Sequence, residues 1–75
     1  MRILLLEDDA RLGLWLKKNL TDDGNITDLF SDGIRAELAI KKINYEMLII
    51  DRMTPGIDGL SLVKKIRSEG NNIPE

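Results

Sequence analysis

Two short apolar runs, at residues 3–6 and 47–50, are the clearest hydrophobic pattern in the chain. Neither run alternates with polar side chains, and each ends directly at acidic residues. Continuous apolar runs of this length are typical of strands in a parallel sheet that is covered on both faces. Residues 25–30 instead mix apolar side chains with Thr27 and Asp28, which indicates an edge strand protected by a charge. The pattern therefore predicts three strands.

A helical repeat separates the first two predicted strands. Leucine recurs every four residues, at Leu12, Leu16 and Leu20, and this spacing places the three side chains on one face of a helix. We therefore predict a helix over residues 10–22. The single tryptophan, Trp15, is expected to pack on the flank of this helix.

Two further helices are predicted, one on each side of residues 47–50. The first opens at Gly33 and the second follows Asp58, and each carries an apolar stripe with a spacing of three or four residues. The stripes consist of Ala36, Ile40 and Ile43 in the first helix and of Leu60, Val63 and Ile66 in the second. The order is therefore β-α-β-α-β-α, and this alternation indicates an α/β fold with a parallel sheet and right-handed crossovers.

Length and composition favour one small globular domain. The 75 residues are 43% hydrophobic and 32% charged, unlike the apolar-poor, highly charged composition of disordered chains. The net charge of −2 offers no basic field for nucleic acid, and the absence of cysteine and histidine excludes thiolate or imidazole chemistry. No apolar run is long enough to cross a membrane, so a cytoplasmic location is expected.

Acidic residues follow the two apolar runs, with Glu7 and Asp8 after the first and Asp51 after the second. In an open parallel sheet, ligands bind outside the carboxyl ends of the strands. If the two strands are neighbours, the three carboxylates converge and repel one another by about 1 kcal/mol per pair at 4 Å in water. A hard divalent cation would offset this repulsion, and Mg²⁺, with Mn²⁺ second, suits carboxylate ligands.

Asp51 is the candidate for covalent chemistry. A carboxylate can attack phosphorus to form an aspartyl phosphate while a bound cation neutralises charge on the transferring group. The simpler alternative is that these acids only cap helices, and we favour it for Asp9 and Asp58 because each precedes a helical pattern. For Glu7, Asp8 and Asp51 together, a chemical role is favoured.

The segments "ILLLEDDARL" and "DRMTPGIDGLSLVKKIR" resemble the response-regulator receiver domain of two-component signalling, in particular its OmpR/PhoB subfamily. The pairing of "EDD" with "D-x-M-x-P-G-x-D-G" at this separation is a specific signal, and the resemblance covers residues 1–75. It implies a flavodoxin-like (CheY-like) parallel sheet with strand order 2-1-3. It also implies a signalling module rather than an enzyme.

The resemblance assigns roles to individual residues. Asp51 becomes the phosphorylated aspartate, Asp8 a direct Mg²⁺ ligand, and Glu7 a residue that reaches the metal through water. Met53 is expected to contribute its backbone carbonyl oxygen to the metal. A sensor histidine kinase would supply the phosphoryl group, and small donors such as acetyl phosphate could replace it. The intact parent protein would control transcription.

A complete receiver domain has five βα units, so residues 1–75 are expected to form a partial domain of three. Strands four and five and a DNA-binding domain would be absent, and DNA contact would need that missing C-terminal part. The third strand would then be an exposed apolar edge, which invites pairing with another chain. A homodimer, formed by edge pairing or by domain swapping, is therefore expected.

The chain departs from the subfamily pattern at three positions. Thr54 replaces a usual apolar residue, and this is expected to loosen the turn after Asp51, while Asn25 and Arg52 are less usual residues at their positions.

Three alternatives were weighed against the receiver domain. A phosphatase of the haloacid dehalogenase type needs a second acid where Met53 stands. A flavodoxin-like FMN site needs neutral phosphate-binding donors after the first strand rather than carboxylates. The remaining alternative is a non-signalling half-domain that assembles through its third strand.

Overall fold

The computed structural model describes residues 1–52, 54 and 56–75. Strands and helices alternate along the chain as the hydrophobic pattern predicts. The elements are β1 (Arg2–Leu6), α1 (Ala10–Asp22), β2 (Ile26–Phe30), α2 (Gly33–Lys42), β3 (Met47–Ile50) and α3 (Gly59–Ser68). Within the described part of the chain, no helix has the length and apolar character needed to span a membrane.

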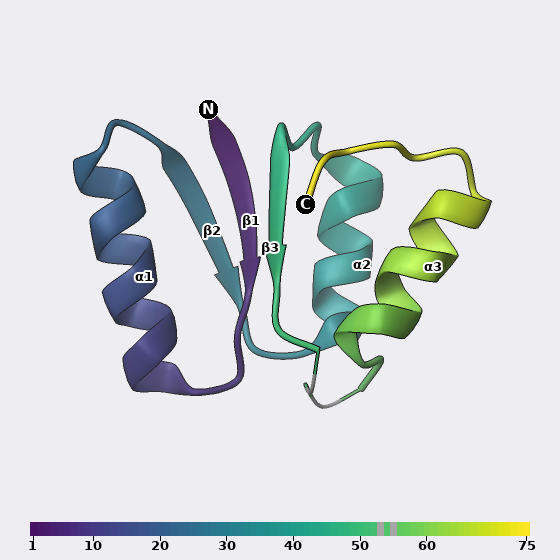
Figure 1. Ribbon diagram of the computed structural model, residues 1–75, viewed down its shortest axis with the longest axis horizontal. Helices are drawn as coiled ribbons and strands as arrows, with labels where there is room; N and C mark the ends of the chain where they lie inside the picture. The colour runs from purple at the N-terminus through teal and green to yellow at the C-terminus, as the bar shows by residue number, and fades with distance from the viewer. Residues whose placement is uncertain (53, 55) are drawn as a thin grey trace.

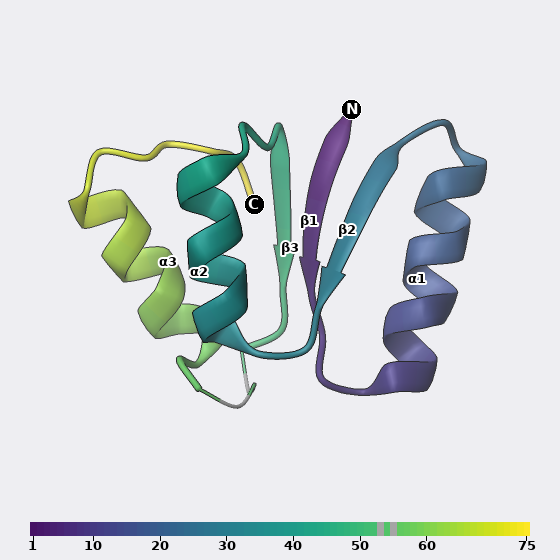
Figure 2. The same cartoon turned by 180° about the vertical axis from the view of Figure 1, so that it is seen from behind.

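The three strands form one parallel sheet in the order β2-β1-β3. Helix α1 lies on one side of the sheet, and α2 and α3 lie together on the other (Figures 1 and 2). In the register of the sheet, Leu4 of β1 faces Leu48 of β3, and Leu6 faces Ile50. The predicted strand order 2-1-3 is confirmed, and β1 is the central strand.

Both faces of β1 are covered, and this explains why its apolar run does not alternate. Leu4 and Leu6 are fully buried in the main core, which also contains Leu48, Leu62 and Ile66. The intervening residues of β1 are buried as well, since Leu5 keeps only 1% of its surface exposed.

Helix α1 meets the sheet through Gly13 rather than through the face predicted from its leucines. A Cβ atom at Gly13 would come within 3.0 Å of a methyl carbon of Leu29, so the helix backbone lies close to β2. Of the predicted stripe, Leu16 and Leu20 are half-buried, whereas Leu12 is exposed. Leu12 is 44% exposed and Trp15 is 61% exposed, and the expectation that Trp15 packs on the helix flank is wrong.

In α3 the buried face includes Ile66 of the predicted stripe but not Leu60. Leu62 and Ile66, one helical turn apart, are buried, whereas Leu60 is 52% exposed. The stripe predicted for α2 is confirmed, because Ala36 and Ile40 are buried and Ile43 packs against them. Apolar residues follow one another closely in α3, so the period alone allowed more than one inner face.

The helix starts are capped by aspartates. Asp9 accepts hydrogen bonds from the backbone N–H groups of Arg11 and Leu12, and Asp58 accepts one from Ser61 at 2.9 Å. The predicted capping roles of Asp9 and Asp58 are confirmed. Asp32 caps α2 in the same way, a role that was not predicted from the sequence.

The C-terminal segment returns from α3 to the edge of β3 (Figure 1). The Leu48 N–H donates a hydrogen bond to the Pro74 carbonyl at 2.8 Å. One polar group on the edge of β3 is therefore paired within the chain, whereas the sequence predicted an exposed edge. Self-association through this strand stays a prediction.

Two neighbouring leucines of α3 test the observed packing. Replacing the fully buried Leu62 by alanine should lower the free energy of unfolding by about 2–5 kcal/mol, because a cavity remains where the side chain packed. Leu60→Ala is the matched control, with an expected change of about 0.5 kcal/mol, since Leu60 is half exposed. Urea denaturation followed by circular dichroism measures both, and equal losses would contradict this orientation of α3.

Candidate metal centre

Backbone hydrogen bonds bring the carboxyl ends of the strands together. The Glu7 N–H donates to the Phe30 carbonyl at the end of β2, and the Asp51 N–H donates to the Leu6 carbonyl at the end of β1, each at 2.9 Å. The parallel pairing therefore continues one residue beyond the strands. It fixes the backbones of Glu7 and Asp51 next to each other at the same end of the sheet.

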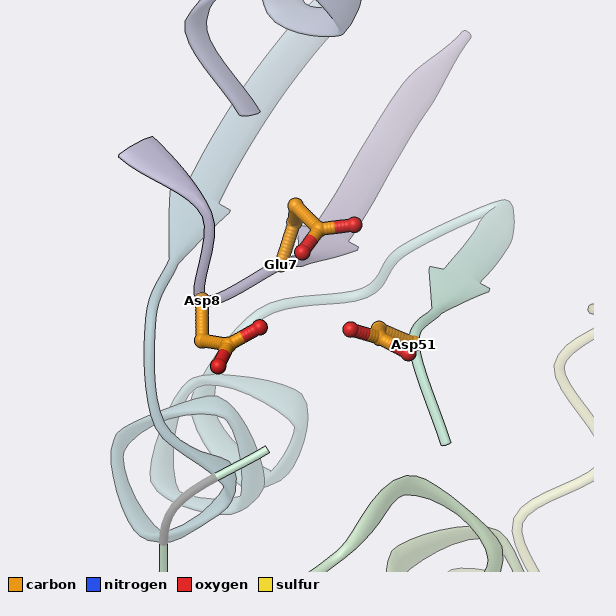
Figure 3. Close-up of side chains that lie close together, drawn as sticks. All are labelled: Glu7, Asp8 and Asp51. Carbon is orange, nitrogen blue, oxygen red and sulfur yellow. The ribbon is translucent and has the colours of Figure 1, made fainter. Parts of the chain in front are cut away.

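The side chains of Glu7, Asp8 and Asp51 converge at this end. Each offers a carboxylate oxygen, and these oxygens all lie within 4.8 Å of one another. Figure 3 shows Asp51 facing the pair formed by Glu7 and Asp8. Asp8 is exposed, whereas Glu7 and Asp51 are half-buried. The convergence predicted from the two apolar runs is confirmed.

The pKa of Glu7 is set by opposing effects, one of which is the negative charge of the neighbouring acid. The Asp9 N–H donates to the Glu7 carboxylate at 3.1 Å and lowers its pKa. Burial, the negative charge of Asp51 and hydrogen bonds with Asp8 and Asp51 act in the opposite direction. The net result is a pKa of Glu7 above its ordinary value of 4.5, so ionisation of this group is less favourable in the folded chain than in a free side chain.

Gly59 sets the approach of α3 to the end of β3. Its N–H donates to the Arg52 carbonyl at 3.0 Å, and a Cβ atom here would overlap the Asp51 carbonyl oxygen. It would also lie 2.6 Å from a methyl carbon of Ile50. Only glycine permits this contact without movement of the backbone. The role of Gly59 was not predicted from the sequence, although its place directly after the capping Asp58 was a usable signal.

Two other positions in the turn after Asp51 were considered from the sequence. Thr54 is 9% exposed, and its hydroxyl donates to the Ile57 carbonyl at 3.3 Å, so the polar group that was expected to loosen the turn has a partner inside it. Met53, the expected backbone ligand, lies outside the described residues.

The donors that converge here fit a hard divalent cation. Three carboxylates from two strands supply only oxygen ligands, which suit Mg²⁺ or Mn²⁺. A bound cation would also offset the negative charge of Asp51, which together with burial raises the pKa of Glu7. Asp51, which is half-buried, is one of the three converging carboxylates.

The family model for the response regulator receiver domain matches residues 3–74. The chain belongs to this family. The resemblance drawn from the sequence is thereby confirmed, and so is the CheY-like class of its fold, because solved receiver domains superpose on it. The receiver-domain match also removes the grounds for the phosphatase and flavodoxin alternatives.

Particular relatives support the assignment. The transcriptional regulatory protein TctD of Salmonella typhimurium is 36% identical over 74 residues, which cover 99% of this chain and 33% of TctD. A receiver domain of the Francisella response regulator 1452 superposes with a TM-score of 0.95 at 33% identity, covering 97% of this chain and 60% of that one. TrrA of Thermotoga maritima, solved in complex with Mg²⁺-BeF, gives 0.85 at 32% identity, covering 91% and 59%.

The chain thus spans about a third of the length of curated relatives such as TctD and PcoR of Escherichia coli. Both proteins are named as transcriptional regulatory proteins.

The raised pKa of Glu7 predicts that its contribution to the stability of the fold decreases as the pH rises, the opposite of the usual effect of a carboxylate. Because the folded pKa of Glu7 lies above 4.5, this residue favours the folded state at low pH, and that contribution is lost as the pH rises from 4.5 through the folded pKa. In metal-free buffer at neutral pH, Glu7→Gln should therefore stabilise the chain by about 1 kcal/mol, the repulsion of one solvent-screened pair. Glutamine keeps an oxygen that can accept from the Asp9 N–H.

Urea denaturation across this pH range measures the effect. Glu75→Gln, a change at the exposed chain end, should leave the pH slope of wild type unaltered. The interpretation is rejected if Glu7→Gln and wild type lose stability in parallel as the pH rises.

Proposed function

We propose that this receiver domain accepts a phosphoryl group on Asp51 with the help of Mg²⁺. The observation that carries the proposal is the convergence of Asp51 with Glu7 and Asp8, which lie more than forty positions earlier in the chain and come from a different strand. Helix capping would not require acids at the ends of two adjacent strands. A site for a cation and a phosphoryl group would require acids at both ends.

Glu7, Asp8 and Asp51 would hold the cation, with Mn²⁺ able to replace Mg²⁺. Family resemblance assigns direct contact to Asp8 and contact through water to Glu7, and it includes Asp51 in the metal site. When bound, the cation neutralises charge on the phosphoryl group during transfer.

Asp51 acts as the nucleophile. One of its carboxylate oxygens forms a bond to phosphorus, while the bond between phosphorus and the donor breaks and its electron pair leaves with the donor. The product is a mixed anhydride between aspartate and phosphate. Rigid placement favours this step, because the Asp51 N–H is hydrogen-bonded to Leu6 and Gly59 packs against the Asp51 carbonyl.

The phosphoryl donor is proposed to be a sensor histidine kinase, in keeping with two-component signalling. Transcription control is proposed for the intact parent, since relatives such as TctD are named as transcriptional regulators. Any DNA contact would come from a part of the parent outside residues 1–75, because this segment has a net charge of −2.

Acetyl phosphate tests the acceptor directly. With Mg²⁺ present, intact mass spectrometry should show one added phosphoryl group on wild type, and hydroxylamine should remove it because it cleaves acyl phosphates. Asp51→Asn should show no added group, since an amide is not a comparable nucleophile.

Asp58→Asn is the matched control for the phosphorylation experiment. Asp58 is an exposed helix cap seven positions further along, and asparagine caps helices about as well as aspartate. This variant should be labelled like wild type. A label that persists on Asp51→Asn would refute the assignment of the acceptor.

A further inference from the structure

The turn between β3 and α3 is held from the side by α2, which has no acid in the metal centre. Ile57, just before the Asp58 cap, points its backbone carbonyl at the start of α2. A Cβ atom at Gly33 would overlap this carbonyl oxygen and would lie 3.1 Å from the Cβ of Ile57. The first residue of α2 is therefore in backbone-to-backbone contact with the turn.

The same carbonyl is also bound from within the turn. The Thr54 hydroxyl donates to it at 3.3 Å, and Thr54 is 91% buried by the surrounding chain. Gly56, between these two residues, has a φ of 83° and packs against Ile34 of α2, where an added Cβ would lie 3.2 Å from Cγ1. The Ile57 carbonyl thus lies between a hydrogen-bond donor on one side and a glycine on the other.

A displacement of Ile57 would be transmitted to Asp51 through Gly59. Gly59, two residues further on, contacts the Asp51 carbonyl and donates to the Arg52 carbonyl. Interiors transmit small displacements because they are closely packed. A shift of the Ile57 carbonyl therefore changes how α3 meets the backbone of the acceptor residue.

We propose that Gly33 and Thr54 are positioning residues for the phosphoacceptor site, acting through the Ile57 carbonyl. They touch neither the cation nor the phosphoryl group. Their role is to fix the turn that follows Asp51, and with it the placement of the Asp51 carboxylate relative to Glu7 and Asp8. This inference rests on the proposed function and adds α2 to the structures on which that function depends.

Thr54 offers the gentlest test. Thr54→Val keeps the shape of the side chain but removes the donor to Ile57, and it should weaken Mn²⁺ binding, measured by isothermal titration calorimetry, by about three- to tenfold. Thr54→Ser keeps the hydroxyl and should restore the wild-type affinity. A purely structural role would lower the unfolding midpoint without separating valine from serine in metal affinity.

Thr27→Val is the matched control. Thr27 is buried to a similar extent, at 5% exposure, and its hydroxyl has no hydrogen-bond partner among the described residues. The same substitution there removes no donor contact, so Mn²⁺ affinity should be unchanged.

Gly33→Ala tests the contact from the side of α2. Alanine favours a helix more than glycine does, so this variant should not weaken α2 itself. Its added Cβ should nevertheless displace the Ile57 carbonyl and lower Mn²⁺ affinity and the rate of labelling by acetyl phosphate.

The outcomes separate the two proposals. If wild type binds Mn²⁺ and is labelled, while Thr54→Val and Gly33→Ala behave like wild type in both, the positioning role is wrong and the proposed function stands. If wild type neither binds Mn²⁺ nor accepts a phosphoryl group, the proposed function fails and this inference fails with it.

Discussion

Parallel pairing of β1 with β3 is the constraint on which the rest of the structure depends. It places Glu7, Asp8 and Asp51 at one end of the sheet, where their carboxylate oxygens lie within 4.8 Å of one another. Burial and the negative charge of Asp51 both disfavour ionised Glu7 in this arrangement, and its pKa is raised. The apolar strands offset that cost, because β1 is buried on both faces and β3 packs against α2 and α3 through Leu48.

A second constraint is the close approach of the first residues of α2 and α3 to the backbone that follows β3. Gly59 lets α3 begin against the Asp51 carbonyl, and Gly33 lets α2 begin against the turn that follows it. Helix starts capped by Asp58 and Asp32 fix both contacts in register. The backbone of Asp51 is thus held by other backbone segments, which favours a single placement of this residue.

The sequence pattern predicted the strands and the acidic residues that follow two of them. The two apolar runs located β1 and β3, and the acids after them located the candidate site. The helical period did not predict the buried face of α3, because it allowed either Leu60 or Leu62 to face inward. It also did not predict the contact face of α1, where Gly13 rather than an apolar side chain meets the sheet. The roles of Gly33 and Gly59 depend on distances between segments far apart in the chain, which no local pattern contains.

Paramagnetic broadening of backbone amide signals by Mn²⁺ tests the central claim most directly. If the three carboxylates form one cation site, substoichiometric Mn²⁺ should broaden first the amides of residues 7–9 and 51–52 and that of Gly59, which donates to Arg52. The amides of residues 22–25, where the exposed acids Asp22 and Asp23 end α1, should remain sharp. Broadening that begins at residues 22–25, or that spreads evenly over the acidic surface, would contradict a cation site at the end of the sheet.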